Sequence, residues 1–180
     1  ATSGRGLRLV IEGRAGSGKT TAVQWLAFTA AQQGLQSLGL PHNRPLLPLF
    51  VRLREAITST RPPSDRTLLY SPQLQDEVAA EWLEECGRLV TPLILLDGWD
   101  EIAIDKVHAA EQWVTSLVSR FPHAHIVVTS RPEGLADATF RKLAFRHVTV
   151  LPLTPQESSE LAQRWFKGLA EQLYASPDID

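Results

Sequence analysis

The segment GRAGSGKT at residues 13–20 constrains the fold most, because a loop of this kind works only between a strand and a helix. Its glycines let the backbone curl until successive N–H groups point inward at a polyphosphate, and the positive end of the following helix adds to that attraction. A short apolar run at residues 7–11 suits the strand, and residues 21–33 have a helical pattern that can end at Gly34. The sequence therefore predicts a phosphate-binding loop in an α/β domain.

The loop also predicts which groups meet the ligand. Lys19 is placed to reach the β- and γ-phosphates, and the hydroxyl of Thr20 is placed to ligate Mg²⁺. A glycine loop with a merely structural role is the alternative, which the position between strand and helix disfavours. The residues expected to hold the nucleotide are Gly13, Arg14, Ala15, Gly16, Ser17, Gly18, Lys19, Thr20 and Thr21.

Apolar runs and helical patterns alternate along the rest of the chain, as is typical of a mainly parallel sheet covered by helices. Pro48 cannot donate to a ladder on both sides, so the second strand should lie at an edge of the sheet. Arg52 and Arg54, on either side of an apolar residue, indicate that this edge strand has one solvated face. The further strands are expected at residues 46–53, 93–96, 126–128 and 147–151.

Capping residues predict where the other helices begin. Ser71 is expected to cap a helix that Pro72 opens and that ends at Gly87, and Asp105 is expected to cap the helix that follows it. Residues 154–157 have the pattern of a capping box for a last helix. The tryptophans predicted to pack in the core from apolar helix faces are Trp25, Trp82, Trp113 and Trp165.

An acidic cluster follows the third expected strand, with Asp97, Asp100 and Glu101 inside the segment DGWDE. The carboxyl end of a parallel strand lies on the same rim as the phosphate loop, where ligands bind in open α/β sheets. Asp97, first after the strand, is therefore expected to hold Mg²⁺ through its water shell. Asp100 or Glu101 is expected to polarise an attacking water. The alternative is a turn followed by acids that cap a helix.

The fourth expected strand ends at the same rim in TSRP, residues 129–132. Arg131 is a candidate sensor of a γ-phosphate, because the guanidinium fork matches phosphate oxygens. A surface arginine before a turn proline is an equally good interpretation of these residues alone.

The composition argues against several other classes of protein. With 18 Lys+Arg against 20 Asp+Glu the net charge is −2, so no basic field indicates nucleic acid or an anionic membrane. Cys86 is the single cysteine, which rules out an internal disulfide and fits a reducing cytosol. The five histidines lack metal-ligand spacing with it, and no G-x-S-x-G elbow is present. We expect a cytoplasmic protein with no nucleic-acid or membrane partner.

Together these segments resemble the NACHT family of signal-transducing P-loop NTPases, part of the STAND group. The most specific segment is LILLDGWDE at residues 93–101, which is similar to the family's extended Walker B motif, with a small residue directly after the metal-binding Asp. The resemblance spans about residues 7–170. The other matching segments are the Walker A loop at 13–20, VRLRE at 51–55, TSRP at 129–132, and LPLT at 151–154 leading to Trp165 and Phe166.

The resemblance implies a three-layer P-loop NTPase sandwich with helices on both faces of a five-stranded, mainly parallel sheet in the order 2-3-4-1-5. It implies ATP or GTP with Mg²⁺, slow hydrolysis, and a nucleotide-controlled change between a closed monomer and a signalling oligomer, in innate immunity or antiviral defence. The roles that it assigns are Lys19 and Thr20 to phosphate and metal, Asp97 to the metal, Asp100 or Glu101 to the water, and Arg131 to the γ-phosphate.

Residues 1–151 are expected to form this core, and residues 152–180 to begin the family's following helical domain within a longer protein. The expected function is a switch that binds a nucleoside triphosphate and self-associates through the full-length protein. The alternatives are a metabolic P-loop kinase or ATPase with rapid turnover, and a scaffold that does not hydrolyse nucleotide. A kinase is disfavoured because the long polar loop carries only Arg61 and Arg66, not an arginine-rich lid.

Overall fold

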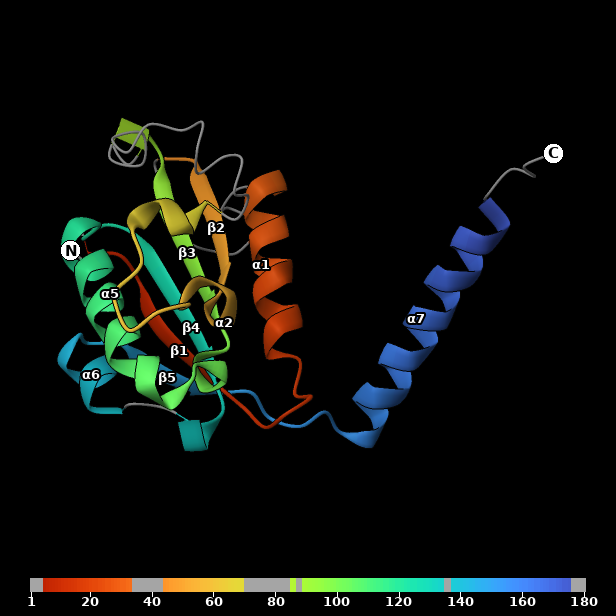
Figure 1. The fold of residues 1–180 in the computed structure, drawn as a ribbon. Helices are drawn as coiled ribbons and strands as arrows, with labels where there is room; N and C mark the ends of the chain where they lie inside the picture. Colours follow the sequence, from red (N-terminus) through yellow and green to blue (C-terminus); the bar gives the residue numbers. More distant parts are fainter. Residues whose placement is uncertain (1–4, 34–43, 70–84, 87–88, 135–136, 176–180) are drawn as a thin grey trace. The chain divides into compact units, whose positions relative to one another are not determined.

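A five-stranded parallel sheet lies at the centre of the structure, a computed structural model that describes residues 5–33, 44–69, 85–86, 89–134 and 137–175 (Figure 1). The strand order is β2-β3-β4-β1-β5, and each neighbouring pair is parallel. The predicted α/β class and strand order are confirmed. The strands are β1 (Arg8–Glu12), β2 (Leu46–Arg52), β3 (Thr91–Asp97), β4 (His125–Ser130) and β5 (Arg146–Thr149).

The position of each strand in the sheet follows from its sequence. Strands β3 and β4 are buried along their whole length, as short apolar runs in the middle of a parallel sheet must be. At one edge, β2 pairs with β3 alone among the described strands, so Pro48 lies where a missing N–H donor is tolerated, as predicted. At the other edge, β5 is exposed throughout and ends slightly earlier than expected.

Helices cover both faces of the sheet (Figure 1). On one face α1 (Lys19–Gln33) packs Val23 and Ala30 against residues of β2, β3 and β4. The opposite face is covered by α5 (Val107–Arg120), together with the short helices α2 (Leu53–Ala56) and α6 (Asp137–Lys142). The buried side chains of α5 are Ala109, Ala110, Trp113, Val114, Leu117 and Val118, largely the face predicted from the sequence.

Two predictions about these helices are wrong. Asp105 does not cap α5, because it lies in a separate 3₁₀ turn, Ile104–Lys106, and the cap position belongs to Lys106 without a side-chain bond. Trp25 is 59% exposed, because α1 has apolar residues on all sides and only a narrow strip of it faces the sheet. The helix expected from Pro72 to Gly87, with its cap Ser71 and with Trp82, lies largely outside the described residues.

The chain divides into two compact units, Ala1–Val150 and Leu151–Asp180. The second contains α7 (Pro155–Ala175), whose start has the predicted capping box: Thr154 N donates to Glu157 Oε2 over 2.8 Å, and Glu157 N donates to Thr154 Oγ1 over 3.2 Å. Two hydrogen bonds from Thr154 lower the pKa of Glu157 below its usual value. The bond from the backbone N–H has the larger effect, and the bond from the hydroxyl has the smaller one.

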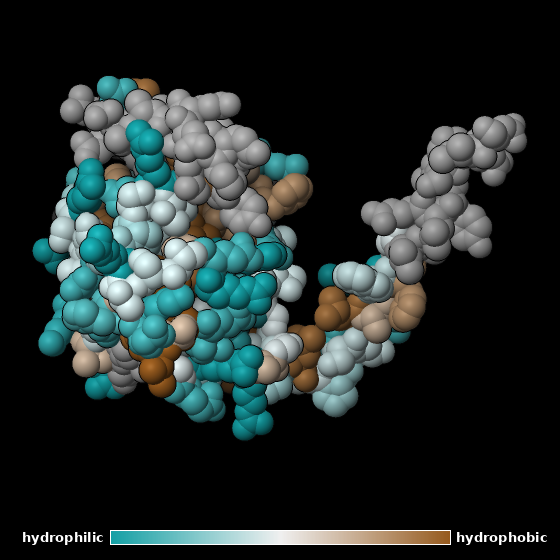
Figure 2. All heavy atoms as spheres, in the orientation of Figure 1, coloured by the Kyte–Doolittle hydropathy of each residue, from teal (hydrophilic) through white to brown (hydrophobic). Residues whose placement is uncertain are grey.

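Apolar side chains of α7 are not covered by other described residues of its own unit. Figure 2 shows hydrophobic surface along this helix, and Leu161, Trp165 and Phe166 are among its exposed side chains. Within this unit no second described helix or sheet covers the apolar stripe of α7, so the packing of Trp165 in a core stays a prediction. Among the described helices, none combines the length and apolar character that crossing a bilayer requires.

Candidate functional site

The phosphate loop joins the end of β1 to the start of α1. Gly16 and Gly18 have φ of +73° and +85°, a left-handed conformation that side chains beyond glycine rarely adopt. Gly13 N donates to Ser130 O over 3.2 Å, which ties the start of the loop to the end of β4. A Cβ at Gly13 would lie 2.5 Å from Ser17 Oγ and 3.3 Å from Val150 Cβ, so a side chain there would displace the Ser17 hydroxyl. The two glycines with positive φ therefore allow the curled backbone that a phosphate-binding loop requires.

Two polar groups of this loop are placed to meet an anion. Lys19 Nζ donates to Gly13 O over 2.6 Å and to Arg14 O over 3.0 Å, which folds the ammonium back over the loop. Ser17 Oγ is buried and has no hydrogen-bond partner among the described residues. A phosphate chain would satisfy both groups, since an ammonium and a hydroxyl are donors for its oxygens. Arg14, Ala15 and Thr21 lie at the surface of the loop and the helix start.

Thr20 and Asp97, the two residues expected to hold a metal, meet at the carboxyl end of the sheet. Thr20 Oγ1 lies 2.9 Å from Asp97 Oδ2 and 3.2 Å from Asp97 Oδ1, although the two residues are 77 positions apart. On its other side the carboxylate accepts a 2.6 Å hydrogen bond from Thr129 Oγ1, which itself accepts one from Gly98 N over 2.9 Å. Asp97 is only 8% exposed, so strands β3 and β4 and helix α1 hold this carboxylate in one place.

The turn after β3 directs the other two acids. Gly98 has φ +82° and ψ 54°, which reverses the chain into the 3₁₀ turn Trp99–Glu101. Trp99 is 1% exposed and packs edge-to-face on Phe140 of α6, with ring centroids 4.8 Å apart. Such an aromatic pair contributes about 0.5–1.5 kcal/mol beyond its buried area, so it anchors the turn. Asp100 and Glu101, on the two following positions, are thereby left at the rim.

Asp100 and Arg131 pair with each other at the rim. Arg131 Nε lies 2.9 Å from Asp100 Oδ2, and the backbone N of Arg131 donates to Asp100 Oδ1 over 3.0 Å. The Asp100 side chain is 13% exposed, and a Cβ at Gly134 would lie 2.5 Å from its Cβ, so the chain closes tightly around it. This carboxylate is thus engaged in holding the candidate sensor arginine. Of the two acids predicted to polarise water, the geometry therefore favours Glu101 over Asp100.

Glu101 faces the metal-site oxygens. It lines a cavity of about 190 Å³ together with Thr20, Asp97, Arg52 and Arg54. Its Oε2 lies 3.3 Å from Arg54 Nη1, and the Glu101 side chain is 46% exposed. Among the predicted site residues, the structure therefore brings Thr20, Asp97 and Glu101 to one cavity.

The role of Arg54 was missed by sequence reasoning. We interpreted it and Arg52 as the solvated face of an edge strand, but β2 ends at Arg52 and Arg54 lies on the helix α2. The polar–apolar–polar pattern of Arg52, Leu53 and Arg54 fits a continuing strand as well as a strand end followed by a helix, so the pattern does not distinguish them. The usable signal was the place of these arginines, directly after the strand next to the one that carries Asp97.

The residues at this cavity fit a magnesium ion and a phosphate chain. A hydroxyl and a carboxylate are the hard oxygen ligands that Mg²⁺ prefers, and it usually binds through one or two protein groups, substrate phosphates and water. Within the described part of the chain, no group of three or more His, Cys, Asp or Glu residues is placed to hold a metal. Thr20 and Asp97 would therefore hold the ion only together with phosphate and water.

A larger cavity, of about 450 Å³, lies between α5 and α6. Its lining is formed by different residues from those of the rim, among them His108, Glu111 and Lys142. It contains none of the predicted site residues, and we do not assign it to nucleotide.

The comparison with solved structures finds chains similar to this one. The Aeropyrum pernix ORC1 protein, solved in complex with DNA, matches with a TM-score of 0.54 and 13% identity, over 90% of this chain and 44% of that chain. Drosophila ORC bound to DNA matches with a TM-score of 0.47 and 19% identity, over 86% of this chain and 38% of that chain. This chain thus spans less than half of either. At such identities the first match shows the P-loop fold alone.

Our expectation that this chain has no nucleic-acid partner gains no support from these comparisons. No curated protein matches the chain. The sequence profile of the NACHT domain matches residues 7–168, nearly the whole chain. Since that match includes the phosphate loop, the Asp97 strand and the Arg131 segment, the chain belongs to the NACHT family and is a nucleotide-binding P-loop NTPase domain.

Proposed function

We propose that this domain is the nucleotide-controlled switch of a signalling protein, which binds ATP or GTP with Mg²⁺ and hydrolyses it slowly. One observation carries the proposal: Thr20 Oγ1 lies 2.9 Å from the Asp97 carboxylate, at the rim where the phosphate loop begins its helix. A hydroxyl and a carboxylate so close together, next to Lys19, form the protein's share of a Mg²⁺–triphosphate site.

Each residue then has a role in binding. The loop N–H groups and Lys19 bind the β- and γ-phosphates, and Thr20 and Asp97 hold Mg²⁺. The ion neutralises charge on the phosphate oxygens when it is bound. Thr129 fixes the Asp97 carboxylate through the 2.6 Å hydrogen bond.

Hydrolysis requires a water placed in line with the terminal phosphorus. The water oxygen bonds to that phosphorus as the bond to the bridging oxygen breaks, which yields the diphosphate and inorganic phosphate, with one water proton kept on the inorganic phosphate and the other released to solvent. Glu101, in the same cavity as Thr20 and Asp97, orients this water by accepting a hydrogen bond from it. Arg131 senses the terminal phosphate when its guanidinium leaves Asp100, to which it is bound in this structure.

The proposal of a slow switch, not a fast enzyme, is supported by the ion pair at the rim between Arg131 and Asp100. Because Arg131 is engaged with Asp100, its guanidinium must exchange partners before it acts on a phosphate. A triphosphate that favours one arrangement and a diphosphate that favours the other would shift the populations of two states. We propose that this difference controls self-association of the full-length protein, as part of a defence response.

The proposal is tested by replacing the Thr20 hydroxyl. Thr20→Val keeps the shape of the side chain and should weaken Mg²⁺-dependent ATP binding by about tenfold or more, because one metal ligand is lost. Thr115→Val on α5 is the matched control, since its hydroxyl donates to Glu111 O away from the rim. Calorimetric titration with and without Mg²⁺ measures both. Equal affinities for the two variants would contradict the metal site.

A further inference from the structure

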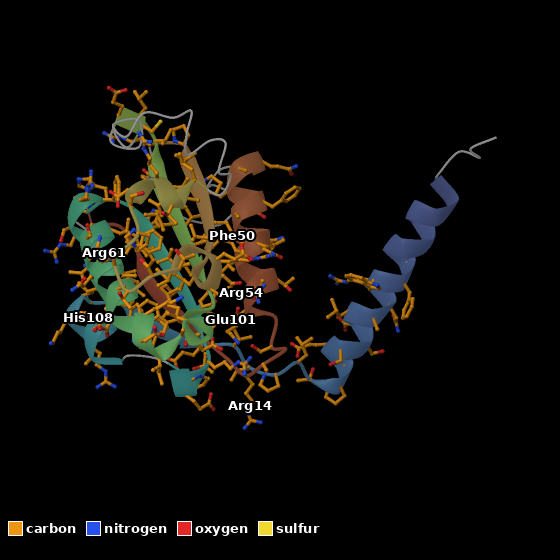
Figure 3. The ribbon with its side chains drawn as sticks, viewed as in Figure 1. Arg14, Phe50, Arg54, Arg61, Glu101 and His108 are labelled. Carbon is orange, nitrogen blue, oxygen red and sulfur yellow. The ribbon has the colours of Figure 1, made fainter. Side chains whose placement is uncertain are left out.

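Arg54 contacts the acid that the proposed hydrolysis depends on. Its Nη1 lies 3.3 Å from Glu101 Oε2, and Figure 3 shows the two labelled side chains next to each other. Arg54 comes from α2, directly after β2, and Glu101 comes from the turn directly after β3. Because β2 and β3 are parallel neighbours, both residues reach the same rim.

The backbone of the turn fixes Glu101 only in part. Glu101 N donates to Gly98 O over 3.1 Å, which sets the position of the main chain. A Cβ at Gly98 would lie 3.2 Å from Glu101 Cδ, so the side chain folds back over the glycine. The carboxylate itself makes one ion pair within the described residues, the one with Arg54. Its orientation in the cavity therefore depends on that arginine.

Arg54 is in turn held by a carboxylate on its own helix. Glu55 Oε1 lies 3.8 Å from Arg54 Nε and 3.4 Å from Arg52 Nη1, so the two arginines and the two glutamates form a chain of alternating charges. Roughly half of each side chain in the Arg54–Glu101 pair is exposed, and exposed ion pairs contribute little to stability. The pair therefore matters for position more than for folding.

We propose that Arg54 is a positioning residue for hydrolysis, which holds the Glu101 carboxylate where it can orient the attacking water. This inference rests on the proposed function, since it assigns Arg54 a task within the same site. Arg54 acts through Glu101 and not on the phosphate, because its guanidinium is already bound to the carboxylate in the cavity that both line.

The test is a double-mutant cycle with Arg54→Gln and Glu101→Gln on the 180-residue chain. Single-turnover hydrolysis of ATP with Mg²⁺ and the dissociation constants of ATP and ADP are measured for each protein. Arg54→Gln should slow hydrolysis about tenfold and leave both dissociation constants within about threefold, and the double variant should be no slower than Glu101→Gln. Arg54→Lys should hydrolyse ATP faster than Arg54→Gln but more slowly than the wild type, because lysine restores the positive charge without the planar guanidinium.

Arg61→Gln is the matched control, the same change on an exposed arginine of the following loop, and it should alter nothing. Three outcomes overturn the inference: an unchanged rate in Arg54→Gln, losses that multiply in the double variant, or weaker binding of ATP but not of ADP, which would mean a direct phosphate contact. A wild-type chain that binds no nucleotide would contradict the proposed function itself, and this inference with it.

Discussion

Two groups of side chains at the same rim of the sheet are held in different ways. Thr20, Asp97 and Thr129 are joined by hydrogen bonds of 2.6–3.2 Å around an almost buried carboxylate. Arg54 and Glu101, across the cavity, are about half exposed and joined by one ion pair of 3.3 Å. The group assigned to binding is rigid, and the group assigned to hydrolysis is adjustable.

This difference agrees with a protein that must hold nucleotide before it hydrolyses it. A buried and fully bonded metal ligand costs little reorganisation when the ion arrives. A half-exposed glutamate that a single ion pair holds is positioned less firmly than a buried one, which agrees with slow hydrolysis. Substitutions in one group at a time should therefore affect binding and hydrolysis separately.

The largest effect is expected from Lys19→Ala, which removes the ammonium from the phosphate loop. Hydrogen bonds to charged groups contribute about 1.5–3 kcal/mol each, so the loss of two should weaken ATP binding roughly 10²- to 10⁴-fold. Calorimetric titration measures this, with Lys142→Ala on α6 as a control of equal charge change. Tight binding by the Lys19 variant would remove the loop from the binding site.

Glu101→Gln should separate binding from hydrolysis. Loss of the group that orients water should slow turnover by about 10²-fold or more, while the affinity for ATP stays unchanged. Glu133→Gln, on the exposed 3₁₀ turn after β4, is the matched control and should hydrolyse ATP normally. If the Glu101 variant loses affinity as strongly as rate, its role is in binding and the two groups are not distinct.

Asp97→Asn should break the rigid group. The amide keeps the shape but not the charge, so Mg²⁺ should lose most of its influence, with affinity for ATP falling between about 10- and 100-fold. Removal of Mg²⁺ by a chelator should produce a similar loss in the wild type and little further loss in the variant. A full chelator effect in Asp97→Asn would place the metal elsewhere.

The smallest effect is expected from Thr129→Val. This substitution compares the two groups by the free energy of unfolding. It leaves the N–H of Gly98 without its 2.9 Å acceptor in a buried place, which should lower the free energy of unfolding by about 1–3 kcal/mol. Arg54→Gln should change it by less than about 1 kcal/mol, because that ion pair is exposed. Urea unfolding measures both, and equal losses would show that the two groups are held alike.

The sequence predicted the fold and the common rim on which Thr20 and Asp97 lie. A phosphate loop demands a strand and a helix around it, Pro48 demands an edge, and the acid after a buried strand must lie at the carboxyl rim. Each of these rules depends on residues close together in the chain. The pairing of Thr20 with Asp97 then follows from the order of the strands.

The adjustable group could not be predicted in the same way. Arg54 and Glu101 are 47 positions apart, and Asp100 lies 31 positions from Arg131, so neither pair has a periodic signal. Which of two adjacent acids faces the cavity depends on the turn that Gly98 and Trp99 impose. Trp25 was misplaced for a related reason, because a helix that is apolar on all sides does not indicate which side is buried.

The most direct test of a slow nucleotide switch is a titration of the chain with ATP, ADP, GTP and GDP, with and without Mg²⁺, in which hydrolysis is followed in the same samples. We predict Mg²⁺-dependent binding of a triphosphate with turnover slower than about one per minute, far below the roughly 10 s⁻¹ that is typical of enzymes. Absence of binding, or rapid turnover stimulated by a small acceptor molecule, would contradict this account.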